Sequence, residues 1–402
     1  MTSAKTNKGN KQFPPFGRVG VGLALRECGM MRKNPIYLVA TIVLPILVML
    51  FFTTMMDEGQ PQEMPVGVVD LDNTSTTRNL MRRLDMMQTS HITAHYPTLS
   101  DARRAIQHNE IYAFIYIPEG TTAKLLASRQ PKISFYYSST SLTAGSLLYR
   151  DLKTVATLGN AGVGQSVMRA KGLTDRQTMA LLQPVTIDLH PLNNAEINYN
   201  LYLSTMLIPA CLMLFITLLT TYTLGQELKQ RRGRELMTLA RQNPIVAVTG
   251  KLLPQTLLFL AITFAYLFYI YGILGFSHQG GIGWMAVYAL LLVFSAQGFG
   301  TFFFGAAPSM RMSMSICSLW GVLSFSMVGA AFPAFAMDPP LEALAWLFPM
   351  RHLWIVYAEN IFNGYPFTDT WPHIAILIIF ATMPLLVMRR IRTVMNTYEY
   401  VE

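Results

Sequence analysis

Charged residues are scarce in this chain, and long stretches contain none. Only 13% of its 402 residues are Asp, Glu, Lys or Arg, whereas 52% are hydrophobic. A soluble domain carries about twice that share of charge, so the composition excludes a soluble protein and is typical of a polytopic membrane protein. The net charge of +9 collects in short segments beside the apolar stretches, where it directs membrane topology, and it calls for no nucleic-acid partner.

Cysteine is almost absent, which argues against a disulfide-rich protein and against a cysteine-ligated metal site. The three cysteines, Cys28, Cys211 and Cys317, fall in or beside apolar stretches, so neither a disulfide framework nor a metal-ligand spacing follows. The acidic turn at residues 70–73 could ligate Ca²⁺ through its clustered oxygens. We favour the other interpretation, in which these residues cap the next helix. We therefore expect no metal site.

Catalytic chemistry is also missing. The predicted spans contain no Asp, Glu, Lys or Arg, although ion-driven pumps carry ionisable groups at membrane depth. Gly250-Lys251 lacks the upstream glycine and the following Ser or Thr of a P-loop. His373 is the only histidine in a span, and it forms no convincing pair with a nucleophile. We expect no catalytic and no cofactor site, so energy for any transport must come from a partner.

Six uncharged stretches are long enough to cross the roughly 30 Å hydrocarbon core as helices. They are residues 36–56, 201–224, 252–274, 284–305, 312–333 and 371–388. Lys and Arg are concentrated in the short segments at one side of these spans, which places that side and both termini in the cytoplasm. The sequence predicts a polytopic α-helical membrane protein with six transmembrane helices.

Residues 57–198 differ from the rest, because charges occur throughout and no run could span a membrane. Apolar runs at 66–69, 91–96, 111–117 and 133–137 alternate with helical patterns at 76–87, 99–109 and 119–128. This alternation predicts a small α/β domain, inserted between helices 1 and 2 on the extracytoplasmic side.

The resulting domain organisation has nine parts. These are 1–35 (cytoplasmic tail and interfacial helix), 36–56 (transmembrane helix 1), 57–198 (extracytoplasmic α/β domain), 199–225 (helix 2), 226–251 (cytoplasmic coupling loop), 252–333 (helices 3–5), 334–370 (extracytoplasmic re-entrant hairpin), 371–388 (helix 6) and 389–402 (cytoplasmic tail).

The basic segment 226–251 lies between two uncharged runs. Gly233 should weaken the helix that continues from the preceding span, and Pro244 should end the helix that restarts after it. A short helix remains, with Leu236, Leu239 and Ala240 on one face. Two interpretations stay open: a loop that only fixes topology, and a docking helix for a cytoplasmic partner. The break, the restart and the Pro stop favour the docking helix.

Residues 334–370 contain apolar pieces that are too short to cross a membrane, and prolines interrupt them. We interpret them as helices that dip into the outer leaflet from outside. Glu359 would be costly against hydrocarbon, so it either faces a cavity at the outer end of a transport path or lies hydrated at the interface. Both alternatives stay open.

The order of one span, a large outside α/β domain and five further spans resembles the ABC-2-type permeases of bacterial ATP-binding-cassette exporters, in particular their multidrug branch. Five stretches carry the resemblance. They are Asn34-Pro35 with Leu44-Pro45, the strand and turn at 66–75, the segment 115–120, the segment Gly233 to Pro244 with Gly250-Lys251 and Pro254, and the outer hairpin from Pro333 through Pro349 to Gly364. Arg234 departs from the pattern, because Thr is common there.

The resemblance implies a transmembrane permease that pairs with a second permease half and with ABC ATPase subunits, which bind the ATP. It implies a bacterial inner-membrane location among membrane lipids, with a periplasmic adaptor as a further candidate partner. The implied ATPase-coupling residues are Glu227, Gly233, Arg234, Glu235, Leu236, Leu239, Arg241 and Pro244. The implied hairpin residues are Pro333, Pro349, Glu359 and Gly364.

A function of another class competes with this one. The outside domain could be a sensor and the membrane part a transmitter of signal or force, with no transported substrate. An ATPase encoded beside the gene would favour the exporter. The substrate itself is not readable, because Met-rich and aromatic spans suit lipids, drugs and hydrophobic peptides equally.

Overall fold

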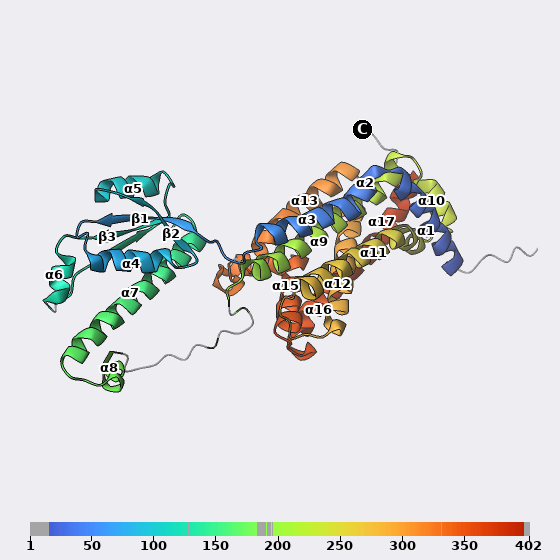
Figure 1. Ribbon diagram of the computed structural model, residues 1–402. Helices are drawn as coiled ribbons and strands as arrows, with labels where there is room; N and C mark the ends of the chain where they lie inside the picture. The colour runs from blue at the N-terminus through green and yellow to red at the C-terminus, as the bar shows by residue number, and fades with distance from the viewer. Residues whose placement is uncertain are drawn as a thin grey trace, which may run out of the picture. The chain divides into compact units, whose positions relative to one another are not determined.

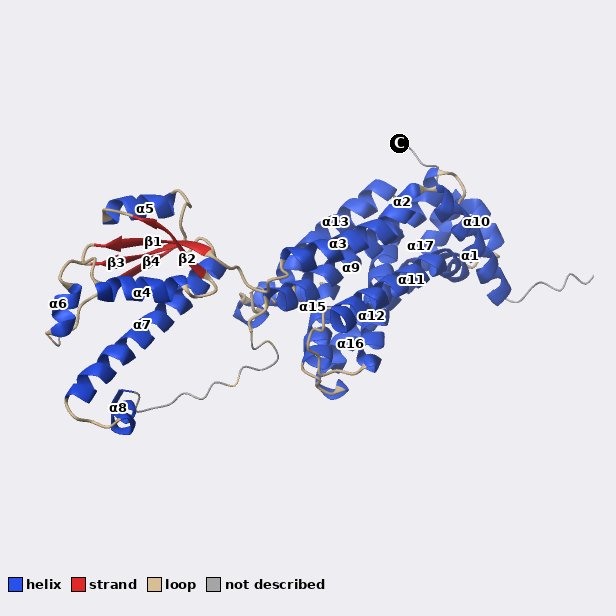
Figure 2. Ribbon diagram, viewed as in Figure 1, coloured by secondary structure: helices blue, strands red, loops and turns tan. Residues whose placement is uncertain are grey.

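The chain folds into two compact units in the computed structural model, which describes residues 16–127, 129–182, 190, 194, 196–330 and 332–397. The first unit combines Met1–Asp57 with Leu192–Glu402, and the second is Glu58–Pro191. Figure 1 follows the chain by colour. Figure 2 shows that, within the described residues, strands occur only in the second unit.

A four-stranded sheet of order β2-β1-β3-β4 forms the centre of the second unit. The strands β1 (Met64–Asp70), β2 (Ser90–His95) and β3 (Ala113–Ile117) are parallel, and β4 (Ser134–Tyr137) is antiparallel to β3. Successive apolar residues make β1 and β3 buried on both faces, as in other sheets covered on two sides.

Helices cover both faces of this sheet. The helices α4 (Ser75–Asp85) and α7 (Leu142–Ala170) lie on one face and α5 (Leu99–Gln107) lies on the other (Figure 1). Because side chains alternate along β3, Ile115 packs into the cluster under α4 and α7, and Phe114 packs into the cluster under α5. The shorter α6 (Thr121–Leu126) and α8 (Asp175–Leu182) complete the unit.

Side chains of the acidic turn after β1 form hydrogen bonds near the start of a helix. The Asp72 carboxylate accepts hydrogen bonds from the backbone N–H groups of Gly120 at 2.9 Å and Thr122 at 3.0 Å, beside the start of α6. The Thr122 hydroxyl also donates to this carboxylate and lowers the pKa of Asp72. Thr74 caps α4 by accepting from the Thr77 N–H. No cluster of three or more metal-ligating side chains occurs in the described ranges. The capping interpretation is not confirmed as stated, because the next helix, α4, is capped by Thr74, whereas Asp72 lies at the start of α6.

Five helical stretches of the first unit are long and apolar enough to cross a membrane. They are Pro35–Met55, Tyr199–Lys229, Pro244–Ile273, Ile282–Ala306 and Phe367–Thr397. The first stretch consists of α2 (Pro35–Leu38), a π-helical turn Val39–Val43 and α3 (Leu44–Met55), and the second is α9 (Tyr199–Lys229). The third is α11 (Pro244–Phe268) with a π turn Tyr269–Ile273, and the fourth is α12 (Ile282–Ala306). The fifth consists of α16 (Phe367–Thr382) and α17 (Pro384–Thr397). The polytopic helical prediction is confirmed at this level.

The fifth predicted span, 312–333, is the one that differs. Its helix α13 (Met310–Met327) ends before Pro333 and is not among the five stretches, because Arg311 and several serines reduce its apolar content. It nevertheless packs against α9 and α12. The structure therefore supports five candidate spans by length and composition, and does not establish six.

Several helices run beyond their predicted ends. The helix α9 continues to Lys229 and therefore contains Glu227, while α11 already begins at Pro244 and contains Lys251. Both charged residues lie outside the predicted spans 201–224 and 252–274, in helical turns that extend beyond them. The helix α17 extends to Thr397, so the described part of the predicted tail 389–402 is helical.

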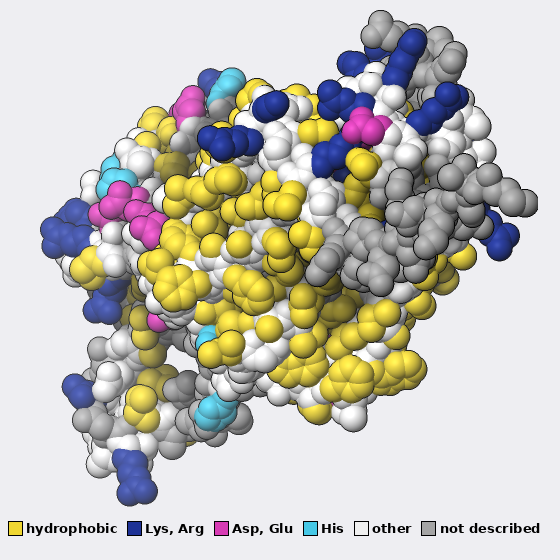
Figure 3. Space-filling view, turned by 90° about the vertical axis from the view of Figure 1, so that its right-hand side faces the viewer, with side chains coloured by type: hydrophobic (Ala, Val, Ile, Leu, Met, Phe, Trp, Pro, Cys, Tyr) yellow, Lys and Arg dark blue, Asp and Glu magenta, His cyan; other side chains and the backbone are white. Residues whose placement is uncertain are grey.

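Hydrophobic side chains cover much of the surface of the helical unit. Figure 3 shows them as a broad field, with Lys and Arg side chains gathered above it. Exposed examples are Leu47 and Phe51 on α3, Leu257 on α11, and Ile379 and Leu386 at the C-terminal helices. Such a field would be a liability in water and is suited to lipid or to a second membrane subunit.

Candidate functional site

The helix α10 (Gly233–Leu239) occupies the segment between α9 and α11. The chain leaves α9 through Arg231, at φ 56°, and leaves α10 through Arg241 and Gln242, at φ 56° and 60°. Asn243 then caps α11 with Pro244 as its first residue. The predicted short helix is present, but Pro244 begins the next helix and does not end α10, because proline fits the first turn of a helix.

Gly233 serves close packing as the first residue of α10. A Cβ atom there would lie 2.5 Å from the carbonyl oxygen of Met395 in α17, which leaves no room for a side chain. The helix breaks before this glycine, at Gln230 to Arg232, and not at the glycine itself. Gly233 therefore allows α10 and α17 to approach.

One face of α10 is buried against other helices, and the other face is exposed. Leu236, Met237 and Ala240 are buried in a cluster with residues of α1, α9, α11 and α17. Leu239 was predicted on the same face as Leu236 and Ala240, but its side chain is 46% exposed. At seven residues the helix is too short for an unambiguous periodicity, so the sequence did not separate the two leucines.

A second contact ties α10 to α17. Arg234 Nε donates a 2.5 Å hydrogen bond to the carbonyl oxygen of Asn396, and Asn396 Nδ2 donates to Gln242 Oε1 at 2.9 Å. Arg234 remains exposed, and Arg241 lies half-buried at the turn that leaves α10. The structure thus brings the predicted coupling residues Gly233, Arg234 and Leu236 against α17.

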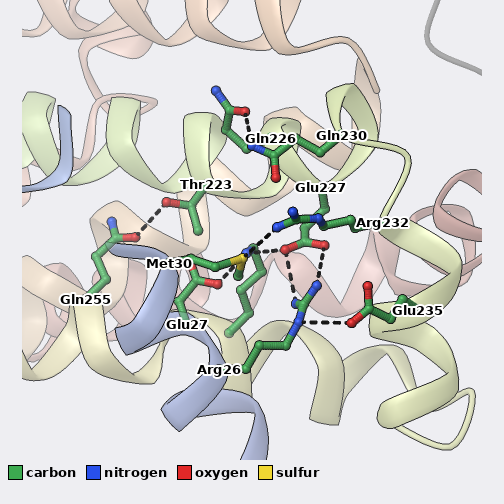
Figure 4. A network of polar contacts seen from close by, with 11 residues as sticks. Arg26, Glu27, Met30, Thr223, Gln226, Glu227, Gln230, Arg232, Glu235 and Gln255 are labelled. Carbon is green, nitrogen blue, oxygen red and sulfur yellow. Dashed lines mark hydrogen bonds and ion pairs between the residues drawn. The ribbon is translucent and has the colours of Figure 1, made fainter. Parts of the chain in front are cut away.

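The remaining predicted coupling carboxylates join an ion cluster (Figure 4). Arg26 of α1 (Phe16–Lys33) holds both oxygens of Glu227 through its Nη1 and Nη2 atoms, at 3.2 and 3.3 Å. Arg26 Nε also lies 3.5 Å from Glu235 Oε1 on α10. On the inner side, Lys251 Nζ lies 2.8 Å from Glu227 Oε1 and 2.6 Å from Glu27 Oε2.

The inner part of this cluster is enclosed by protein. The exposed fractions of Lys251, Glu27 and Glu227 are 1%, 1% and 2%. Burial raises the pKa of the Glu27 carboxyl, and the Lys251 ammonium opposes that rise. Together with Arg26, two cations face two carboxylates, so the buried charge is balanced. Removing one partner from such a group costs about 3–5 kcal/mol, since the other partner stays buried and unpaired.

Sequence reasoning missed Arg26 and Glu27 as site residues. It named Lys251 as a topological charge and as part of the Gly250-Lys251 motif, but not as a coupling residue. One signal was available. Glu27 lies between Leu23 and Met31 at a spacing of four residues, so it occupies the buried stripe of α1 instead of its polar face. A carboxylate on such a stripe indicates a cationic partner on the surface that the stripe covers.

Neutral polar side chains continue from this cluster into the bundle. Gln255, one turn after Lys251, accepts from the Thr223 hydroxyl at 3.3 Å and donates to Thr220 Oγ1 at 3.2 Å. The Thr256 hydroxyl donates to Gln297 Oε1 at 2.8 Å. These buried contacts join α9, α11 and α12, as expected for polar side chains that must find partners inside a helical bundle.

The hairpin residues lie elsewhere in the unit, in and around α14 (Pro339–Ala345), α15 (Pro349–Val356) and the π turn Tyr357–Phe362. Pro349 is the first residue of α15, and Pro333 precedes the short 3-10 turn Ala334–Ala336. Glu359 is half-buried in the π turn, and Gly364, at φ 72°, packs against Gln279.

His373, the histidine predicted in a span, contacts a second histidine from the hairpin. His352 Nδ1 and His373 Nδ1 lie 2.8 Å apart, and His352 Nε2 lies 2.9 Å from the carbonyl oxygen of Trp346. Since a carbonyl only accepts, His352 Nε2 carries its proton, and His373 Nδ1 donates to His352. The pair joins α15 to α16 and involves no nucleophile.

Comparison with protein families explains this architecture. Residues 35–388 match the family described as ABC-2 family transporter protein, which includes all but the N-terminal segment and the last residues. Comparison with curated proteins finds no match. The match extends over most of the chain and includes four of the five candidate spans completely and the fifth as far as residue 388. The chain therefore belongs to the ABC-2 transporter family and is the multi-pass membrane permease of an ABC transporter, whose partners are ATPase subunits.

Proposed function

We propose that this permease is the transmembrane subunit of an ATP-driven bacterial exporter, that it forms half of the substrate path, and that α10 is the docking element for the ATPase. The second half would be another permease chain seated in the same inner membrane. A periplasmic adaptor and a multidrug substrate range belong to the same proposal. Its support is the family membership together with the geometry of α10.

The observation that carries the proposal is the two-sided character of α10. Its buried face, Leu236, Met237 and Ala240, packs on other helices of the unit, whereas Leu239 is 46% and Glu235 57% exposed. A loop that only fixed topology would need Lys and Arg, but neither a buried apolar face nor an exposed leucine. An anchored helix with an exposed apolar residue is suited to receive a partner and to pass on its movement.

Charge reversal of Arg234 and Arg241 to Glu tests the docking role. We expect co-purification of the partner ATPase to fall at least tenfold, because Arg234 is exposed on α10 and Arg241 is half-exposed at the turn that leaves it. Membrane insertion should be unchanged, since Arg231 and Arg232 still mark the same side. The measurement is the ATPase recovered per permease after detergent extraction. Unchanged recovery together with unchanged export would exclude docking through α10.

The substitution Leu239→Asp probes the same face with one residue, and Leu71→Asp is its matched control. Leu71 has the same 46% exposure but lies in the α/β unit. Only Leu239→Asp should lower ATPase recovery. An equal effect of both variants would show that an added carboxylate acts non-specifically.

The proposed topology has six spans, with α13 as the fifth, both termini cytoplasmic and the α/β unit outside. Cysteines introduced one at a time, after replacement of Cys28, Cys211 and Cys317 by Ser, test it. A membrane-impermeant reagent added outside should label positions 73, 279 and 363 and should miss 231 and 398. Residue 398 lies outside the described residues. Labelling of position 231 in intact cells would overturn this topology.

Assays on the complex of permease and ATPase distinguish export from the competing function, which is signal transmission. An exporter hydrolyses ATP and moves a compound across vesicles that contain both subunits. A transmitter without an ATPase partner would show neither result. We retain the exporter, because the matched family is one of transporter proteins.

A further inference from the structure

We propose that α1 is a moving part of the coupling machinery, and that Glu27 and Lys251 are the positioning residues that make it so. This inference rests on the proposed function, since it assumes that α10 receives the movement of an ATPase. It assigns a role to a helix that the sequence analysis placed only at the membrane surface.

The first support is a continuous chain of charged contacts from α10 to α11. Glu235 of α10 meets Arg26 Nε, the other nitrogens of Arg26 hold Glu227 of α9, and Lys251 of α11 holds both Glu227 and Glu27. Neighbouring residues of α1, Arg26 and Glu27, supply the outer and the inner link. Figure 4 shows Arg26 pointing toward Glu227 and Glu235 together.

The second support is the difference in solvent exposure between the outer and the inner link. Arg26 is 19% exposed and Glu235 57%, so the outer link can lengthen or re-form in water when α10 moves. The inner link between Glu27 and Lys251 is enclosed at 1% exposure for each residue, and separating it would leave bare charges in the protein interior. Movement of α10 is passed to α1 through apolar packing, because Leu236 and Met237 of α10 lie in one buried cluster with Leu23 of α1. The inner link then makes α1 and α11 move together.

The third support is backbone contact beside the inner link. Gly250, the residue before Lys251, faces α1 so closely that a Cβ atom there would lie 3.0 Å from Leu23 Cβ and 3.2 Å from the carbonyl oxygen of Gly20. The two helices contact each other along much of α1. A tight glycine contact next to a buried ion pair resists both sliding and separation.

The positioned pair also lies at the start of the polar contacts inside the bundle. Gln255 follows Lys251 by one helical turn and joins α11 to Thr220 and Thr223 of α9. A shift of α1 with α11 therefore changes the part of the bundle where α9, α11 and α12 meet.

The experiment separates positioning from simple stabilisation. Lys251→Met alone leaves Glu27 buried without a cation, and we expect the complex with the ATPase to be recovered at less than a fifth of the normal yield. Lys251→Met with Glu27→Leu removes both buried charges of the inner link, while Arg26 still holds Glu227. Such paired replacement often leaves stability unchanged, so recovery should return to within about twofold of the unmodified complex.

The decisive measurement is ATP hydrolysis by the double variant in lipid vesicles. If the pair positions α1, kcat of the complex should fall at least fivefold while KM for ATP stays unchanged, because the ATPase is bound but its movement is no longer passed on. Normal kcat with normal recovery would overturn the proposal and leave the pair a purely structural contact. Loss of ATPase binding in the double variant would also overturn it, because the pair would then shape the docking surface.

A milder variant covers the case in which the double variant does not fold. Glu27→Gln keeps an oxygen that accepts from Lys251, and Lys251 remains paired with Glu227. We expect this variant to bind the ATPase normally with a reduced kcat, and an unchanged kcat would overturn the proposal. Failure of the docking proposal would look different, because ATPase recovery would then be insensitive to Arg234 and Arg241 as well.

Discussion

Replacement of residues 58–191 by a short Gly/Ser linker is expected to abolish export while the ATPase still co-purifies with the permease. The two units have separate hydrophobic clusters, so removal of the α/β unit deletes its own clusters and leaves those of the helical unit complete. A transport path through a membrane needs only spanning helices, and the proposed purpose of an additional folded unit is to receive cargo or to hand it on. The measurement is transport in vesicles together with ATPase recovery.

The control carries the same linker inserted between Gly59 and Gln60 with the α/β unit retained. It should export normally, which would assign the loss to the missing unit and not to the junction. Full export by the deletion variant would show that the unit takes no part in transport. Loss of the ATPase from the deletion variant would show that the helical unit does not assemble alone, contrary to our expectation.

Gly298→Val is expected to cause a large loss of stability in the helical unit. A Cβ atom at Gly298 of α12 would contact the carbonyl oxygen of Phe380 below normal separation and lie 2.7 Å from the Cα atom of Ala381. Both obstacles are backbone atoms of α16, so no side-chain rotation relieves them. Overpacking typically costs about 1–3 kcal/mol and more against rigid neighbours, so we expect a loss of about 3 kcal/mol or more.

The matched control for this substitution is Gly283→Val in the first turn of the same helix. Nothing lies within 4 Å of a Cβ atom at Gly283, so that variant should unfold at nearly the normal temperature. Thermal unfolding in detergent compares the two. Equal unfolding temperatures for the two variants would show that α12 and α16 can separate without cost.

Most element positions follow from local pattern. Predicted runs at 66–69, 91–96, 111–117 and 133–137 overlap β1 to β4, and the pattern at 99–109 overlaps α5. Alternating or continuous apolarity depends on residues close in sequence, so it is readable without a structure. Helix ends were less well predicted. The span 201–224 was ended before the first charged residue, whereas α9 continues through Glu227 to Lys229.

The candidate site was predictable in part. The break before α10, the short helix and the basic character of its surroundings were visible in the sequence, and Leu236 and Ala240, predicted to share a face, are both buried. The roles of Leu239 and Lys251 were not visible. Each role depends on whether another helix covers the residue, and that helix can lie far away in the sequence. Lys251 and its partner Glu27 are more than a hundred residues apart, as are Arg234 and Asn396.

By itself the sequence determined that this protein is a polytopic helical membrane protein, because length, apolarity and charge position act locally on each segment. The ABC-2 family was indicated by the resemblance of its motifs and shown by the family match. Only the tertiary structure decided which charges are paired. From the sequence alone, an ionisable residue beside a span is interpreted as a solvated charge that directs topology, because a partner on another helix cannot be recognised. Here α1 brings Arg26 and Glu27 to Glu227 and Lys251, and burial at 1–2% exposure of the inner three makes that pairing obligatory.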